Sequence, residues 1–376
     1  MIANPYAPYA LDAEERIRAS ARHIVSATAH VDGMDPVDLD VEDASIEFDD
    51  SRAPRIQGTL TCKLPAADVL EAFDARKTFR IRVHAGYKYD SVTQDVHLLA
   101  DLHVRDRQVK RPANRVVFQV WSDEGLAMDY KRLAWDSQPP QSNLLDAVKY
   151  HVLIASIGSE VPPVLTDYPN EYGAAAVAGL VQEPGQSGWA MLAETAARAG
   201  VSIYCEPDRT WRIARPQALA STTSLNFTTG GGGLIIESNS VYSRDNFRNA
   251  VCIKYSWRDA GGADHVIWGH AYIGSGEFSV GEIGYNSHYE ERDKPATQAQ
   301  ADQAAQNVLV ALARRGRSFV LDAPSAYWLR PGMTITATLP EGDQERLLVS
   351  AVYFNFPSGS MSVRLRQPED LPISSN

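Results

Sequence analysis

The segment IQGTLTCKL, residues Ile56 to Leu64, alternates between two kinds of side chain. One set is apolar or small and consists of Ile56, Gly58, Leu60, Cys62 and Leu64. The other set is polar and consists of Gln57, Thr59, Thr61 and Lys63. Because successive side chains of a strand point to opposite faces, this pattern predicts a strand with one face in a core and one face in water. Such strands are typical of antiparallel sheets.

Similar strand patterns surround this segment at short intervals, with turn residues between them. They cover Arg18–Val31, Ile46–Asp49, Thr78–Ala85, Val96–Val104 and Arg115–Trp121. One helical pattern interrupts them at Ala66–Arg76. Strands at this spacing predict an antiparallel barrel or sandwich. We expect the pair Pro139-Pro140 to end this first unit, near residue 140.

The next part of the chain changes character and favours helices. Leu144–Ile157 has apolar residues at helical spacing, and Gly188–Ala199 is rich in alanine and stops at Gly200, a typical residue after the last helical turn. Two short strands follow, joined by the turn Pro207-Asp208-Arg209. A helix next to a hairpin predicts a small α+β module.

The glycine-rich stretch Ser221–Gly233 is predicted to be a boundary or long loop. Beyond it, Ala299–Arg315 is a clear amphipathic helix with Thr297 before it as a candidate N-cap. Strands are predicted at Asn249–Ser256, His265–Trp268, Ser318–Leu321, Thr334–Leu339, Arg346–Phe354 and Ser360–Arg366. The fold class is therefore β-rich α+β, with units at 1–140, 141–220 and 221–376, the last carrying an inserted loop and helix.

Composition limits the function. The chain has 376 residues and a net charge of -11, which speaks against gripping nucleic acid, because phosphate neutralisation needs clustered Lys and Arg. It does not exclude a surface along which DNA slides. No run of about 18 apolar residues occurs, and Met1–Leu11 lacks the features of a signal peptide. We expect a protein made in the cytoplasm, with no membrane anchor and no export by the general secretory route.

The cysteine and glycine patterns do not match the motifs of metal sites or nucleotide sites. The three cysteines, Cys62, Cys205 and Cys252, lie far apart and lack the spacing of a zinc site. The glycines at 230–233 are followed by Leu234 and not by the Lys-Ser/Thr pair of a phosphate loop.

His97, Asp101 and His103 share one strand face. Residues four or six apart along a strand are separated by roughly 13 or 20 Å, which is too far for one ion to bridge. We expect this to be a solvated or subunit-facing strand face.

Catalytic patterns are equally weak. The segment Gly185-Gln186-Ser187-Gly188 has the wrong spacing for a serine nucleophile elbow. The acid pairs Asp49-Asp50 and Glu290-Glu291 could in principle hydrolyse a glycan, but a chain with 47 acidic residues contains such pairs by chance. We assign no catalytic, cofactor-binding or metal-ligating residue, and we expect no cofactor and no enzymatic activity.

Aromatic residues are the remaining candidates. Trp257, Trp268, Tyr272 and Tyr285 lie in or beside the glycine-rich region Gly261–Gly284. Such residues can anchor a subunit interface or stack on sugars. We favour subunit contact.

The order of the segments resembles the tail-tip or baseplate hub family of tailed phages, often called minor tail proteins. Four places carry the resemblance: "APRIQGTLTCKLP", "HLLADLHVRDRQVKRPANRVVFQVWSDEGLAMDYKRL", "GQSGWAMLAETAARAGVSIYCEPDRTWRIARP", and the set "RNAVCIKY", the Ala299–Arg315 helix, "YWLRPGMTITATLP" and "LLVSAVYFNFPSGSMSVRLRQPED". Together they run from about Arg18 to Asp370. Each element alone is degenerate, and it is their ordered combination that is similar to the family.

The resemblance implies two tube-forming β-barrel hub domains flanking the helix-plus-hairpin module. It also implies a homotrimer at the tail tip of a virion, assembled in the host cytoplasm. Its partners would be distal tail and tail tube proteins, the tape measure protein and a central fibre or spike, with DNA passing through the lumen. Because the chain stops at Asn376 after the second barrel, we expect any peptidase or lysozyme activity to belong to another protein. The alternatives are a tail-associated cell-wall hydrolase or peptidase, and a receptor- or carbohydrate-binding tail protein.

Overall fold

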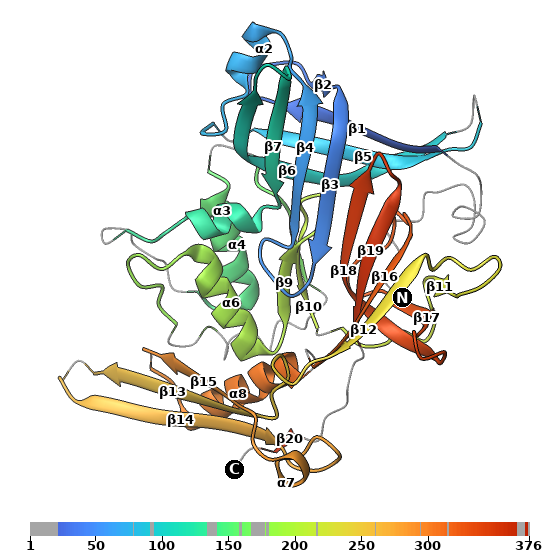
Figure 1. Ribbon diagram of the computed structural model, residues 1–376. Coiled ribbons are helices and arrows are strands. Elements are labelled where there is room, and N and C mark those ends of the chain that lie inside the picture. The colour runs from blue at the N-terminus through green and yellow to red at the C-terminus, as the bar shows by residue number, and fades with distance from the viewer. Residues whose placement is uncertain are drawn as a thin grey trace.

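The computed structural model packs the described strands and helices around three hydrophobic cores, and Figure 1 shows how these elements are arranged. It describes residues 22–77, 79–90, 94–133, 141–157, 160–166, 177, 180–215, 217–259, 261–293, 295–313, 316–366 and the backbone of 373–374. The predicted boundary at Pro139-Pro140, the predicted strand residues 18–21, the segment 1–11 and the last part of the resemblance, 367–370, lie outside these residues. No helix in the described ranges is long and apolar enough to cross a membrane.

The first β-unit is an antiparallel arrangement in the order β3-β4-β7-β6-β5-β1-β2. Its core face carries the apolar residues of the alternating segment, with Ile56, Leu60 and Cys62 fully buried. The alternation therefore predicted both the strand and its buried face. The elements are β1 (Arg22–His30), β2 (Val37–Leu39), β3 (Val41–Asp49), β4 (Ile56–Lys63), α2 (Ala67–Ala72), β5 (Arg80–Lys88), β6 (Gln94–Lys110) and β7 (Arg115–Trp121).

The second β-unit continues the same sheet. Its strand β18 turns from one partner to another: residues 344–348 pair with β17, and residues 351–356 pair with β3 of the first unit. The described strands thus form one 13-stranded sheet over one continuous core. The elements are β11 (Asn226–Phe227), β12 (Glu237–Tyr242), β16 (Arg317–Pro324), β17 (Thr334–Thr338), β18 (Gln344–Phe356) and β19 (Ser360–Arg366).

The sheet is open in its hydrogen bonding. Its main path runs from β12 at one edge to β2 at the other, and the pairings among the described strands do not close it into a barrel. What is established is a largely antiparallel β-rich fold with few helices. The strand pairings do not show the two closed barrels that the resemblance implied.

The helical module lies between the first β-unit and the inserted unit (Figure 1). Trp211, Leu192 and Val148 are at the centre of its core. Helix α6 begins where the hydroxyl of Ser187 accepts from the N–H of Ala190, and it ends at Gly200, whose φ of 64° is left-handed. The elements are α3 (Glu124–Asp129), α4 (Leu144–Ala155), β8 (Val164–Thr166), α6 (Gly188–Ala199), β9 (Ser202–Cys205) and β10 (Trp211–Ala214).

The segment inserted in the second β-unit has its own sheet, which the sequence analysis did not anticipate as a unit. Strands in the order β15-β13-β14-β20 cover one side of α8, with a separate core. Thr297 caps α8 as predicted, and Gln300 reciprocates by accepting from the N–H of Thr297. The elements are β13 (Ala250–Arg258), β14 (Asp264–Ile273), α7 (Val280–Ile283), β15 (Ser287–Arg292), α8 (Gln298–Ala313) and β20 (Ile373–Ser374).

Candidate functional site

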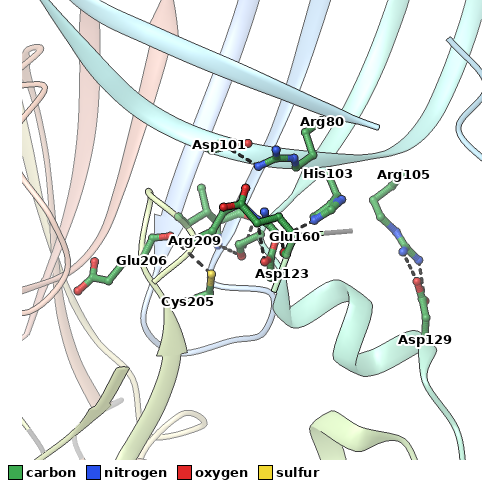
Figure 2. A network of polar contacts seen from close by, with 12 residues as sticks. Arg80, Asp101, His103, Arg105, Asp123, Asp129, Glu160, Cys205, Glu206 and Arg209 are labelled. Atoms are coloured by element: carbon green, nitrogen blue, oxygen red, sulfur yellow. Dashed lines mark hydrogen bonds and ion pairs between the residues drawn. The ribbon is translucent and has the colours of Figure 1, made fainter. Parts of the chain in front are cut away.

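A buried polar network joins the first β-unit to the helical module (Figure 2). Its residues come from β6, from the start of α3 and from the β9–β10 turn. The turn reaches the sheet directly, because the N–H of Asp101 on β6 donates to the carbonyl of Pro207 at 2.8 Å. We call this set, centred on His103, Asp123 and Arg209, the polar junction.

Asp123 is the centre of the polar junction. Its two carboxylate oxygens face different partners: Nε2 of His103 lies 2.9 Å from Oδ1, and Nε of Arg209 donates to Oδ2 at 3.0 Å. The three side chains are 2 to 5% exposed. Arg209 also donates to the carbonyl of Glu160. A buried carboxylate between two basic groups fixes the relative position of sheet and module.

Asp101 extends the network along the sheet. Its Oδ2 accepts from Nη1 of Arg80 at 3.0 Å and from Nε of Arg82 at 2.9 Å. The prediction that His97, Asp101 and His103 form a solvated or subunit-facing strand is therefore wrong for Asp101 and His103, which are 5% and 2% exposed. The module covers this part of the long strand β6, and a strand pattern by itself does not reveal such a cover.

The three candidate ligands are also separated in their contacts. His97 is half-buried and bonds Asp95 at 3.1 Å, whereas the other two face arginines and Asp123. An extra residue in β6, where the pairing with β5 shifts at Val83/His84, further interrupts the shared face. Within the described ranges, no three His, Cys, Asp or Glu side chains are placed to hold a metal ion.

Glu124 and Cys205 lie next to the polar junction and are both buried. Oε1 of Glu124 accepts from the N–H of Cys205 at 2.8 Å. Burial raises the pKa of the Glu124 carboxyl and raises the pKa of the Cys205 thiol well above its usual range. A nucleophilic cysteine needs a lowered pKa, and the shift of the Cys205 thiol has the opposite direction.

The two acid pairs considered for hydrolysis are engaged in ion pairs. Arg364 pairs with Asp49 at 3.4 Å and Arg366 pairs with Asp50 at 3.1 Å, which links the end of β3 to β19. Glu290 and Glu291 point to opposite faces of β15, where they pair with Arg292 and Lys254 respectively. Because Glu290 and Glu291 lie on opposite faces of the strand, they do not present the facing carboxylates that glycoside hydrolysis requires.

The glycine and serine motifs have local structural roles. Gly230 and Gly232 have positive φ, and the N–H of Gly233 donates to the carbonyl of Gly230, so 230–233 is a tight turn. Ser187 caps α6 with its hydroxyl. Residues 230–233 are thus a turn, and Ser187 is the N-cap of a helix.

The four candidate aromatic residues do not form one cluster. Trp257 stacks on His265, on the side of the sheet that faces α8, while Trp268 lies on the opposite side beside Tyr289. Tyr285 follows α7 and is 72% exposed. Tyr272 lies on β14, four residues after Trp268, and is half-buried. The four residues therefore occupy more than one place in the inserted unit.

Similar proteins are found by structure and not by sequence. No protein-family model matches the chain, and no curated protein matches its sequence. A tail protein from Neisseria meningitidis MC58 has a TM-score of 0.65 at 14% identity, over 91% of this chain and 96% of that chain. The prophage MuSo2 43 kDa tail protein from Shewanella oneidensis has a TM-score of 0.62 at 13% identity, over 91% and 98% of the two chains.

A third solved structure gives the same picture. The prophage tail protein gp18 from Listeria monocytogenes EGD-e has a TM-score of 0.52 at 10% identity, over 92% of this chain and 95% of that chain. The agreement extends over nearly the full length of each protein. At these identities it establishes the fold, and it confirms at that level the resemblance to phage tail proteins.

Proposed function

We propose that this chain, which has the fold of phage tail proteins, is the hub at the tip of a phage tail. Three copies would form a ring that joins the hexameric tail tube to a central fibre or spike and encloses part of the DNA exit channel. The proposed role is structural and not enzymatic, and the proposed place is the virion, after assembly in the host cytoplasm.

The observation that carries the proposal is the doubled β-architecture. The first β-unit and the second β-unit are joined edge to edge by the β3–β18 pairing, so one chain presents two sheet segments in a fixed relation. If each segment forms one sixth of a ring, three chains supply six. This would match the symmetry of a hexameric tube without requiring six identical subunits.

We propose the division 1–140, 141–220 and 221–376 for the first tube-forming domain, the helical module and the second tube-forming domain with its insertion. Helix α3 falls within 1–140 in this division, although its Ala127 packs in the core of the helical module. The polar junction would then hold the module at a set angle to the tube-forming domain. That angle would position the module for contacts with the fibre or spike, the tail tube proteins and the tape measure protein.

The negative net charge of the chain supports the proposal that DNA moves through a channel formed in part by this protein. The chain carries 47 acidic and 36 basic residues, for a net charge of -11. Duplex DNA is repelled by such a surface unless cations are clustered along it. We expect the purified protein to leave a 30-base-pair duplex unshifted in a mobility assay at low salt. A tight, salt-dependent complex would contradict a sliding channel.

The decisive experiment is the mass and outline of the purified full chain. Light scattering is expected to give three times the chain mass of 41.3 kDa, and negative-stain microscopy a ring with sixfold appearance. A dimer, a tetramer or an open filament would overturn the proposed stoichiometry. A monomer that degraded cell wall would favour the hydrolase alternative.

A further inference from the structure

A cavity of about 700 Å³ lies where the helical module, the β-units and the inserted unit meet. Its volume is within the range of pockets that bind small molecules. None of the residues discussed for the proposed function explains it, and its walls differ in chemistry.

One wall is apolar and belongs to the helical module. Trp189, Ala193 and Ala196 line the cavity from α6, and their spacing of four and three residues places them on one helix face. Ile203 of β9 continues this wall. An occupant therefore meets a surface suited to an aliphatic or aromatic group.

A second part of the lining is cationic. Five arginines line the cavity, against two carboxylates, Asp50 and Glu124. Four of the arginines are also ion-paired, Arg52 with Glu47, Arg317 with Glu345, Arg364 with Asp49 and Arg366 with Asp50, and the Arg364 pair is the longest of the four. The arginines are Arg52 and Arg55 from the β3–β4 connection, Arg317 from β16, and Arg364 and Arg366 from β19.

Arg364 has donor capacity for a ligand. Its bond to Asp49 is 3.4 Å long and its side chain is 49% exposed. Asp49 already accepts from both the N–H and the hydroxyl of Ser51, at 2.8 and 2.6 Å. A guanidinium has five N–H donors in a fixed fork, so Arg364 can grip a carboxylate at little cost to its existing contact.

We propose that this cavity binds an acidic peptide segment of another protein, with its carboxylates on the arginine wall and an apolar side chain against α6. A nucleic acid fits less well. Its phosphates require cations along an extended surface, whereas here the arginines face one pocket that also contains Asp50 and Glu124. The proposal does not depend on trimer formation.

The probe for this site is a capped hexapeptide, Glu-Leu-Glu-Glu-Leu-Glu, titrated into the full-length protein by calorimetry. The matched ligand control is Gln-Leu-Gln-Gln-Leu-Gln, which has the same shape without charge. We expect the acidic peptide to bind at least about tenfold more tightly, as the loss of a charge-assisted hydrogen bond implies. Equal binding of both peptides, or no binding of the acidic one at millimolar concentration, would overturn the proposal.

Two pairs of variants locate the site. Arg364→Gln is expected to weaken binding about tenfold, while Arg258→Gln, an exposed arginine on β13 outside the cavity, leaves it unchanged. Ala193 is exposed on α6, so both Ala193→Glu and Ala193→Lys keep the helix. Only the glutamate should repel the peptide. If both position-193 variants bind like the wild type, the peptide does not occupy this cavity.

Trp189 provides an independent readout. Peptide binding is expected to change the tryptophan fluorescence of the wild type but not that of Trp189→Phe, although calorimetry still detects binding in that variant. An identical fluorescence change in both proteins would place the peptide elsewhere and refute the assignment. Displacement of the peptide by a DNA duplex in the wild type, and not in Arg364→Gln, would identify nucleic acid as the occupant instead.

Discussion

Replacing Asp123 with alanine removes the central group of the polar junction. The wild-type carboxylate lies 2.9 Å from Nε2 of His103 and 3.0 Å from Nε of Arg209, and all three side chains are almost inaccessible to water. After the substitution, the guanidinium of Arg209 keeps the Glu160 carbonyl but loses its ion pair with Asp123. We expect a large loss of stability at this interface.

The magnitude follows from burial. Breaking a buried ion pair by removing one partner costs about 3–5 kcal/mol, because the other charge stays buried and uncompensated. Arg258 and Asp264 provide the matched control: Nε and Oδ1 are 3.2 Å apart, but the two side chains are 69% and 77% exposed. Exposed pairs contribute only about 0–1 kcal/mol. Asp264→Ala should therefore be nearly neutral.

The assay is urea unfolding followed by tryptophan fluorescence, since Trp189 and Trp211 both belong to the helical module. With a urea m-value of roughly 3 kcal/mol per M, Asp123→Ala should lower the midpoint by about 1 M or more. Adding Arg209→Met to Asp123→Ala removes the unpaired buried charge and should restore part of the lost stability. Equal midpoints for the Asp123→Ala and Asp264→Ala proteins, or a double variant no more stable than Asp123→Ala alone, would refute the reasoning.

Three further outcomes are expected. Burial lowers the pKa of His151 to about 4, so as the pH falls below 6.5 the unfolded chain takes up a proton before the folded chain does. The free energy of unfolding should therefore drop by about 3 kcal/mol by pH 4. His151→Leu should remove this pH dependence from denaturation curves. A Cβ on Gly269 would lie 2.1 Å from the carbonyl oxygen of Ala301, so Gly269→Ala should lower the free energy of unfolding in urea by more than about 2 kcal/mol. Gly281→Ala is the control: its Cβ would meet nothing closer than 3.9 Å, so the free energy of unfolding should hardly change. Cys252 is the one cysteine that is not fully buried, so a thiol reagent should label one site per native chain and three after unfolding.

Local patterns determined most of the secondary structure. The alternation in Ile56–Leu64 predicts β4 because strand geometry alone places every second side chain on one face. Helix α6 is delimited by Ser187 and Gly200, whose capping roles depend on a few neighbouring backbone groups. Short strands such as β2, β8 and β15 were missed, because their pairing partners and not their own sequences hold them in place.

Only the tertiary structure decided where these elements meet. The sequence shows that Asp101 and His103 are polar residues on a strand, but not that a distant turn covers them. Nor does it show that Arg80 and Arg82 pair with Asp101, or that His103 lies beside Asp123. The continuous sheet depends on the pairing of β3 with β18, about 300 residues apart in the chain. The arginine-lined cavity likewise draws its walls from segments between residues 50 and 366. Periodicity is a local property, whereas burial and charge pairing depend on which surfaces the fold brings together.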